Sequence, residues 1–216
     1  MVIIGLTGSI GMGKSTTAAL FRAMGVPVHD ADAEVHALYD GAAAASIEAA
    51  FPGVLAHGRV ARPLLGARVL GDPDAMRRLE AIIHPLVRDR RDALLMAAHK
   101  AGRKSILLDI PLLFETGADC GCDVVTVVSA PFAVQKQRVL ARTAMTDEKF
   151  HAILDRQMPD AEKRKRAHFV IDTGRGIDAA RRQVRDFLRA IETLDGRNWR
   201  ALLIQAAKDG GSGLVP

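Results

Sequence analysis

One stretch near the amino terminus limits the possible folds more than any other part of this 216-residue chain. A short apolar run, Val2–Leu6, leads into GSIGMGKS at residues 8–15, which fits the pattern G-x-x-x-x-G-K-[ST] in full. The residues that follow, Lys14–Met24, favour a helix. A strand, a glycine-rich loop and a helix in this order are typical of a phosphate-binding loop, the P-loop.

The P-loop predicts a bound nucleoside triphosphate. Its glycines, Gly8, Gly11 and Gly13, let the backbone adopt positive φ and bring successive N–H groups to the phosphate oxygens. Lys14 is expected to place its charge on the β- and γ-phosphates, and Ser15 to offer its hydroxyl to Mg²⁺. The helix that begins here adds its positive end.

Four further β-branched runs have the length and composition of buried strands. They are Val26–His29, Ser105–Ile110, Val124–Ser129 and Phe169–Asp172. Short, continuous apolar runs suit strands that are covered on both faces, and strands separated by helices imply a parallel sheet. The predicted fold class is therefore α/β, a three-layer P-loop NTPase fold with a five-stranded parallel sheet.

Two regions interrupt the alternation of strands and helices. Residues 31–100 have almost no strand signal and are expected to form a helical lobe, with helices over Ala31–Phe51 and Arg62–Lys100. Residues 138–166, which are dense in Arg and Lys, are expected to form two helices around Pro159 that act as a mobile lid. A solvated amphipathic face is the alternative for this basic segment.

We expect one domain over residues 1–208. Its core comprises residues 1–30, 101–137 and 167–208, and the final helix is expected to follow Trp199 and to end at Asp209. The composition of residues 209–216 predicts a flexible tail.

Carboxylates follow two of the predicted strands. Asp30 and Asp32 come after the second strand, and Asp109 ends the third. Ligands of open parallel sheets lie beyond the carboxyl ends of the strands, so Asp30 or Asp32 can orient a hydroxyl or accept its proton. The alternative is that one of them caps the next helix. Asp109 is expected to help hold Mg²⁺ with Ser15. For Glu115, a surface or capping role is equally compatible.

Several basic side chains are candidates for contacts with phosphate. Arg138 and Arg142 are four residues apart on one predicted helix and would share a face, from which they can close over a triphosphate. The run Lys163–Arg166 fits this role and a solvated surface equally well. In the lobe, His84 is either structural or binds an acidic substrate group together with Arg88, one helical turn further on.

Composition excludes several classes of partner. The formal charge is +5, but acidic residues are interleaved throughout, and only 4% of residues are aromatic, which disfavours a nucleic-acid binder. No apolar run approaches the roughly 18 residues of a membrane helix, and no signal segment precedes Val2. Cys120 and Cys122 suit neither a disulfide nor a zinc site, so we expect a cytoplasmic protein with reduced thiols.

Five segments together resemble the dephospho-CoA kinase family. They are IGLTGSIGMGKST, VPVHDADAEVHAL, LEAIIHPLVR, LLDIPLLFE, and the stretch from QRVLART to RQMPDAEKRKRAHFVID. They occur in the family's order and spacing and cover most of residues 3–173. A P-loop is generic to many NTPases, whereas DAD-x-x-x-H, E-x-I-x-HP-x-V-R and D-x-PLLFE are far more specific.

The resemblance implies a nucleoside-monophosphate-kinase-like fold with a coenzyme A lobe over about residues 31–100. The implied reaction is ATP-dependent phosphorylation of the ribose 3′-hydroxyl of dephospho-CoA, the last step of coenzyme A biosynthesis. By position, Gly11 to Thr16, Met12 included, would hold ATP, with Lys14 also catalytic. Asp32 would face the 3′-hydroxyl, and His36, His84 and Arg88 would line the acceptor site. Arg138 would act catalytically from the lid, and Arg142 would contact the nucleotide.

One departure from the family's pattern concerns the last strand. The family commonly has an asparagine after it, whereas this chain has Asp172-Thr173-Gly174. The resemblance therefore gives no adenine contact at that position.

Other functions fit the sequence less well. Another small-molecule P-loop kinase, acting on a nucleoside or sugar hydroxyl, would share the fold and differ in its acceptor. A GTP-hydrolysing switch would need an N-K-x-D motif, which the chain lacks. Dephospho-CoA is therefore the expected partner, with no nucleic acid or membrane, and the protein is expected to be a monomer or a weak homo-oligomer.

Overall fold

The computed structural model describes residues 1–198, and its centre is a parallel sheet of five strands in the order β2-β5-β1-β6-β7. The strands are β1 (Val2–Thr7), β2 (Val28–Asp30), β5 (Ser105–Asp109), β6 (Val124–Ser129) and β7 (Phe169–Asp172). This confirms the predicted parallel sheet. The expected helix after Trp199 and the expected tail lie outside the described residues.

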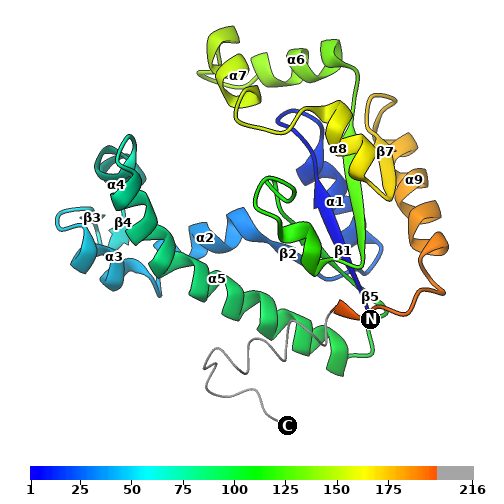
Figure 1. Ribbon diagram of the computed structural model, residues 1–216, viewed down its shortest axis with the longest axis horizontal. Coiled ribbons are helices and arrows are strands. Elements are labelled where there is room, and N and C mark those ends of the chain that lie inside the picture. The colour runs from blue at the N-terminus through cyan, green and yellow to red at the C-terminus, as the bar shows by residue number, and fades with distance from the viewer. Residues whose placement is uncertain (199–216) are drawn as a thin grey trace.

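The strands are continuous apolar runs because helices cover both faces of the sheet. In β1, Val2, Ile4 and Leu6 pack into one hydrophobic core, whereas Ile3 packs into another. The first core is closed by α1 (Lys14–Ala23) and α9 (Ile177–Ala190), and the second by the end of α5 (Pro73–Lys100) and residues near α8 (Asp160–Arg166). Figure 1 shows these layers around the sheet.

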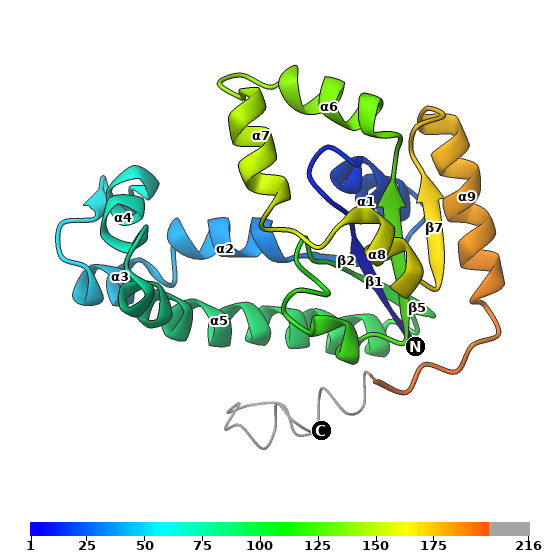
Figure 2. The ribbon, with the colours of Figure 1, turned by 45° about the horizontal axis from the view of Figure 1, so that its top comes forward.

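A lobe with its own core extends from the sheet. It contains α2 (Ala31–Tyr39), α3 (Ala44–Ala50) and α4 (Arg62–Val69), and its hydrophobic cluster includes Leu38, Ile47 and Phe51. Helix α5 joins the lobe to the sheet, because Leu79 and Ile83 pack in the lobe while Leu95 packs under the sheet. Figure 2 shows α2 and α5 running together from the sheet to the lobe.

The lobe also contains a small hairpin that the sequence did not predict. Strands β3 (Leu55–Ala56) and β4 (Arg59–Val60) pair antiparallel around His57 and Gly58, which have φ values of 51° and 77°. Strands of two residues are too short to leave a periodic pattern. Residues 31–100 have almost no strand, as predicted, apart from these four residues.

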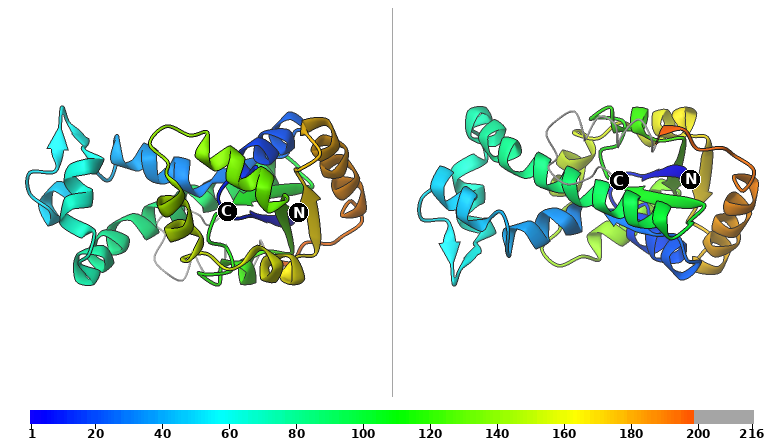
Figure 3. Two further views of the ribbon diagram at one scale, coloured as in Figure 1. Left: turned by 90° about the horizontal axis from the view of Figure 1, so that it is seen from above. Right: turned by 90° about the horizontal axis from the view of Figure 1, so that it is seen from below.

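Three helices lie between β6 and β7, and the last two are on either side of Pro159, as predicted for the basic segment. They are α6 (Phe132–Leu140), α7 (Asp147–Leu154) and α8, while Ala118–Gly121 forms a short 3₁₀ helix, η1, before β6. Pro159 is the residue before α8, as its missing N–H favours. Figure 3 shows that α6 and α7 lie over one end of the sheet, beside the lobe. Among residues 1–198, no helix is long and apolar enough to span a bilayer.

Two predicted boundaries also move. Strand β2 begins at Val28, because Pro27 has no N–H to donate and contributes only its carbonyl, which accepts from the Leu107 N–H at 2.9 Å. Helix α6 ends at Leu140, so Arg142 lies beyond it and not on a shared helical face with Arg138.

Candidate active site

The P-loop joins the carboxyl end of β1 to α1, and glycine is required at two of its positions. Gly11 and Gly13 have φ values of 77° and 85°, in the left-handed region. A Cβ on Gly11 would also lie 2.5 Å from a methyl group of Val139. Gly13 is the residue before α1, and the first turn of α1 carries no acidic side chain. The N–H groups of this turn can therefore bind an anion.

Lys14 and Asp109 form an ion pair at the centre of the site. The Nζ of Lys14 lies 2.6 Å from Oδ1 of Asp109, whose side chain is only 1% exposed. The sheet register places Leu6, Asp109 and Asp30 side by side at the carboxyl ends of β1, β5 and β2. Burial raises the pKa of Asp109; the charge of Lys14 opposes this shift, and the nearby carboxylates of Asp30 and Asp32 add to it.

Asp30 and Asp32 have different environments although they are two residues apart. Oδ1 of Asp30 accepts a hydrogen bond of 3.0 Å from the N–H of Ala33 and so caps α2. Asp32 lies in the first turn of α2 and is exposed, and its carboxylate makes no hydrogen bond or ion pair with another of residues 1–198. The structure therefore gives the capping role to Asp30 and leaves the Asp32 carboxylate available.

A cavity of about 330 Å³ lies over the P-loop. Side chains from the loop, from α2 and from the segments around α6 and α7 line it. The lining includes Gly8, Gly11, Gly13, Lys14, Ser15, Thr16, Asp32, Pro111, Arg142 and Gln157. The cavity thus brings the Asp32 carboxylate to the same space as the lysine and the hydroxyl of the P-loop, and we call it the P-loop cavity.

A second cavity, of about 250 Å³, adjoins the first and shares Gly11, Gly13, Thr16 and Arg142 with it. Its other lining residues include Arg138, Thr173 and Ile177. The two terminal nitrogens of Arg138 donate to the hydroxyl and the carbonyl of Thr173, at 3.0 and 2.7 Å. The hydroxyl of Thr173 also donates to the carbonyl of Met12 at 2.8 Å, so the end of β7 is tied to the P-loop.

Comparisons with known proteins point to a single family. The family profile described as "Dephospho-CoA kinase" matches residues 2–178. The chain belongs to the dephospho-CoA kinase family. It is a phosphotransferase with dephospho-CoA kinase activity, which is the final step of coenzyme A biosynthesis.

Individual relatives agree with this assignment. The dephospho-CoA kinase of Mesorhizobium japonicum is 60% identical over 184 residues, which are 85% of this chain and 93% of the relative. That of Brucella melitensis is 54% identical over 191 residues, covering 88% and 96%.

Two solved structures resemble this chain in fold, and one of them is a dephospho-CoA kinase. The dephospho-CoA kinase from Campylobacter jejuni aligns with a TM-score of 0.66 at 27% identity, over 88% of this chain and 96% of that one. The protein TT1252 from Thermus thermophilus aligns with a TM-score of 0.76 at 36% identity, over 90% and 98%.

Two glutamines that the sequence reasoning missed hold the apex of the P-loop in this family member. The N–H of Ile10 donates to Oε1 of Gln157 at 3.0 Å, and the carbonyl of Ile10 accepts from Nε2 of Gln135 at 2.8 Å. Gln135 belongs to α6, and Gln157 follows α7. Gln157 lies within the RQMPD stretch of the family's pattern. That stretch was the one feature of the sequence that could have pointed to a role for this glutamine.

Glu115 and Lys163 form a second ion pair below the site. Lys163 Nζ lies 2.8 Å from Glu115 Oε1, with the lysine side chain fully buried and the glutamate 18% exposed. The same carboxylate oxygen accepts from the N–H of Met158 at 2.8 Å. Lys163 therefore fixes α8 to the segment after Asp109. Its role here is structural, and differs from both roles predicted for the run Lys163–Arg166, a phosphate contact and a solvated surface.

The remaining predicted residues lie in different places. The Met12 side chain is buried, and its sulfur accepts a hydrogen bond from the N–H of Ala130 at 3.1 Å. Only the backbone of Met12 is therefore available to a ligand of the P-loop. His36 is on α2, one helical turn after Asp32, and His84 and Arg88 are one turn apart on α5. All three are exposed, and none of them lines either cavity within residues 1–198.

Proposed function

We propose that the P-loop cavity is where this dephospho-CoA kinase transfers the γ-phosphoryl group of ATP to the ribose 3′-hydroxyl of dephospho-CoA. The observation that carries the proposal is the position of Asp32. Its carboxylate lines the same cavity as Lys14 and Ser15 and makes no hydrogen bond or ion pair with another of residues 1–198. It is thus available to a hydroxyl that points at the bound phosphates.

The nucleotide is held by the backbone of the P-loop and by cations. The N–H groups from Gly11 to Thr16 surround the β-phosphate, and Lys14 moves from Asp109 to the β- and γ-phosphates. Arg142 borders both cavities and Arg138 the second one, so their charges neutralise the transferred group from the lid side. The base and sugar of ATP occupy the second cavity beside Ile177.

In the transfer, the 3′-oxygen forms a bond to the γ-phosphorus while the bond to the β,γ-bridging oxygen breaks and ADP leaves. Asp32 orients the hydroxyl and accepts its proton. Because the transition state of phosphoryl transfer is loose, a carboxylate of ordinary base strength is sufficient.

The site has two oxygen donors that suit Mg²⁺, and the phosphates of ATP would supply further ligands. The hydroxyl of Ser15 and the carboxylate of Asp109 are hard oxygen donors, as Mg²⁺ prefers. Within residues 1–198, no group of three or more His, Cys, Asp or Glu side chains is placed to hold a metal ion. Ser15 and Asp109 would hold the ion together with phosphate oxygens of the nucleotide, and the ion would neutralise negative charge on the transferred group.

The lobe over residues 31–100 receives the acceptor. Asp32 and His36 lie one turn apart on α2, which packs on α5 through the ion pair of Arg90 and Glu34 at 3.1 Å. His84 and Arg88 are on that same α5 and bind the anionic end of dephospho-CoA. The enzyme works in the cytoplasm as a monomer or a weak homo-oligomer.

A coupled assay of ADP release with ATP, Mg²⁺ and a panel of hydroxyl acceptors tests this proposal. We expect turnover with dephospho-CoA and little with nucleosides, gluconate or shikimate. Turnover with one of those acceptors and none with dephospho-CoA would support the other reading, a different small-molecule P-loop kinase. Sedimentation of the purified protein with and without ATP measures the oligomeric state.

A further inference from the structure

A third cavity lies at the opposite end of the sheet from the P-loop. It has a volume of about 560 Å³, and its lining includes Val2 and Ser105, which begin β1 and β5. The P-loop follows the other end of β1, and six residues of strand separate the two ends by roughly 20 Å. This basal cavity is therefore distinct from the site that binds ATP and dephospho-CoA.

The floor of the basal cavity is apolar. Val2, Val26 and Ile191 are 3%, 7% and 7% exposed, and Met24 and Leu188 pack against the same core at its edge. These five side chains come from β1, from the end of α1 and from the region of α9. A volume within the usual range for small-molecule sites and a floor of this kind suit a ligand with an apolar body.

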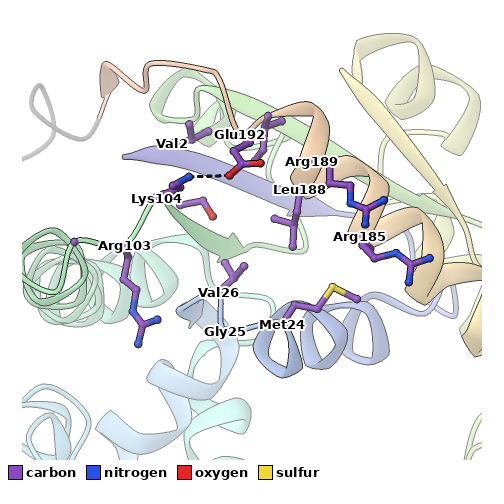
Figure 4. Close-up of a pocket in the computed structure, with 13 residues that line it drawn as sticks. Val2, Met24, Gly25, Val26, Arg103, Lys104, Arg185, Leu188, Arg189 and Glu192 are labelled. Atoms are coloured by element: carbon purple, nitrogen blue, oxygen red, sulfur yellow. Dashed lines mark hydrogen bonds and ion pairs between the residues drawn. The ribbon is translucent and has the colours of Figure 1, made fainter.

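The rim of the basal cavity is cationic. Four of its lining side chains are basic and one is acidic, and Lys104 pairs with that acid, Glu192, at 2.7 Å. The side chains of Arg103, Arg185 and Arg189 are exposed and form no hydrogen bond or ion pair with another of residues 1–198. Figure 4 shows Arg103 on one side and the other two on the opposite side, with Val26, Met24 and Leu188 between them.

This arrangement selects a ligand by charge as well as by shape. Arg185 and Arg189 are four residues apart on α9, so they present two guanidinium groups on one face, and like charges at this spacing repel. An anionic group between them removes the repulsion and forms charge-assisted hydrogen bonds. The apolar part of the same molecule can then cover the floor.

We propose that the basal cavity binds a small amphipathic organic anion, an alkyl carboxylate whose head group meets Arg185 and Arg189 and whose chain lies on Met24 and Leu188, while Arg103 adds positive charge from the facing side. The commitment to a small molecule follows from the volume of about 560 Å³, which is within the usual range for small-molecule sites. The commitment to an anion follows from three cations that lack a partner in the described chain.

The probe that tests the proposal is decanoate, used with full-length protein that carries ¹³C-methyl methionine. Met24 lines the basal cavity, whereas Met12 is buried in the P-loop, so one spectrum contains a reporter and an internal control. We expect a saturable shift of the Met24 methyl signal and no shift of the Met12 signal. Decyltrimethylammonium, which has the same chain and the opposite charge, should leave both signals in place.

Two pairs of substitutions on α9 then separate the site from general charge. Arg185→Ala with Arg189→Ala should weaken decanoate binding by about tenfold or more, because two charge-assisted contacts are lost. Arg181→Ala with Arg182→Ala removes the same charge from the same helix outside the cavity and should leave the affinity unchanged. Arg103→Glu, on the facing loop, should weaken binding without touching α9. Kinase turnover, which uses none of these arginines, reports that each variant is folded.

Three results would overturn the proposal. They are the absence of a saturable Met24 shift, equal binding of the ammonium probe, and equal losses in the two pairs of α9 variants. Sedimentation with anionic phospholipid vesicles tests whether the basic and apolar side chains of the cavity bind a membrane surface and not a free anion. Vesicle binding without any response to decanoate would assign this basic face to a membrane surface and would also overturn the proposal.

Discussion

At the scale of single residues, the site depends on two carboxylates with different tasks. Asp30 ends β2 and its side chain closes the first turn of α2, whereas Asp32, two residues later, lines the P-loop cavity. The same residue type therefore supports structure at one position and is available for chemistry at the other.

This difference predicts unequal effects of the same substitution. Asp32→Asn should lower kcat by roughly 100-fold or more, because the amide cannot accept the hydroxyl proton. The Tm should stay close to that of the parent, since Asp32 has no hydrogen bond to lose. Asp30→Asn is the control: asparagine caps a helix as well as aspartate does, so kcat and Tm should both change little. Near-normal kcat in Asp32→Asn would remove this residue from catalysis.

The P-loop lysine gives a second residue-scale prediction. Lys14→Ala should lower kcat more strongly than it lowers the free energy of unfolding, because it removes the charge on the transferred phosphate and leaves only Asp109 without its partner. Asp109 has a raised pKa owing to burial, so without the lysine it can take a proton in place of a charge. Urea unfolding and steady-state kinetics on the same preparation test both parts.

The two cysteines differ in reactivity for a physical reason. Both are free, with Cys120 exposed and Cys122 buried, as expected for reduced thiols. Burial, with the nearby charges of Asp119 and Asp123, raises the pKa of Cys122 to about 12, so about one thiol in 10,000 is ionised at pH 8. A thiol reagent should modify one cysteine quickly in the native protein, and Cys120→Ser should abolish that fast phase. Fast modification of Cys122 in this variant would contradict the buried placement.

At the scale of elements, the decisive contact is the one between α8 and the segment that follows β5. Lys163 is fully buried on a helix whose three following residues are exposed, and its charge is matched by Glu115. Burial of Glu115 by itself would raise its pKa, but the hydrogen bonds from Lys163 and Met158 outweigh this and lower it.

Breaking this pair should destabilise the fold strongly. Lys163→Met leaves a carboxylate without its partner and should lower the free energy of unfolding by about 3–5 kcal/mol. Lys165→Met is the matched control on the same helix; its ion pair with Glu162 is exposed, so the loss should be about 1 kcal/mol or less. Urea denaturation measures both variants, and equal losses would contradict the buried pair.

The pH dependence of this difference has a definite sign. Because the pKa of Glu115 is lowered in the fold, its contribution is complete above the ordinary value of 4.5 and is lost as the pH falls through the folded pKa. The difference between the parent and Lys163→Met should therefore shrink below pH 4.5. A difference that stays constant over this interval would mean that packing, and not charge, explains the loss.

At the scale of the whole molecule, a lobe and a lid flank one end of the sheet. Helix α5 belongs to both the lobe and the sheet, and Gln157 and Gln135 connect the lid segments to the apex of the P-loop. The N–H of Ile10, which donates a hydrogen bond to Gln157, belongs to the P-loop. The segments around α6 and α7 are thus linked to the P-loop through these two glutamines.

We predict that residues 138–168 become protected when ATP binds. Limited trypsin digestion should slow in this segment with ATP and Mg²⁺, because Arg142 moves onto the phosphates. Gln157→Ala should speed digestion without nucleotide, since it releases the lid from Ile10. Gln137→Ala, an exposed glutamine on α6, should not. Identical digestion with and without ATP would rule out lid closure.

The sequence predicted the elements that depend on local patterns. Continuous apolar runs gave the five strands and their parallel arrangement, since only strands covered on both faces tolerate such runs. It missed the hairpin at residues 55–60, whose strands are too short for periodicity, and it placed Arg142 on a helix that ends at Leu140.

What the sequence determined by itself was the chemistry of the phosphate end: the spacing of glycine, lysine and serine in the P-loop is a local property and follows from the chain alone. The tertiary structure decided which of two aspartates is available, what Lys163 pairs with, and how Gln157 and Thr173 reach the loop. Those outcomes depend on contacts between residues 48 to 161 positions apart, or on which side chain a cap uses, and no local pattern encodes them. Burial and strand register exist only in the folded chain. They explain why residues of the same type, such as Asp30 and Asp32, have different roles.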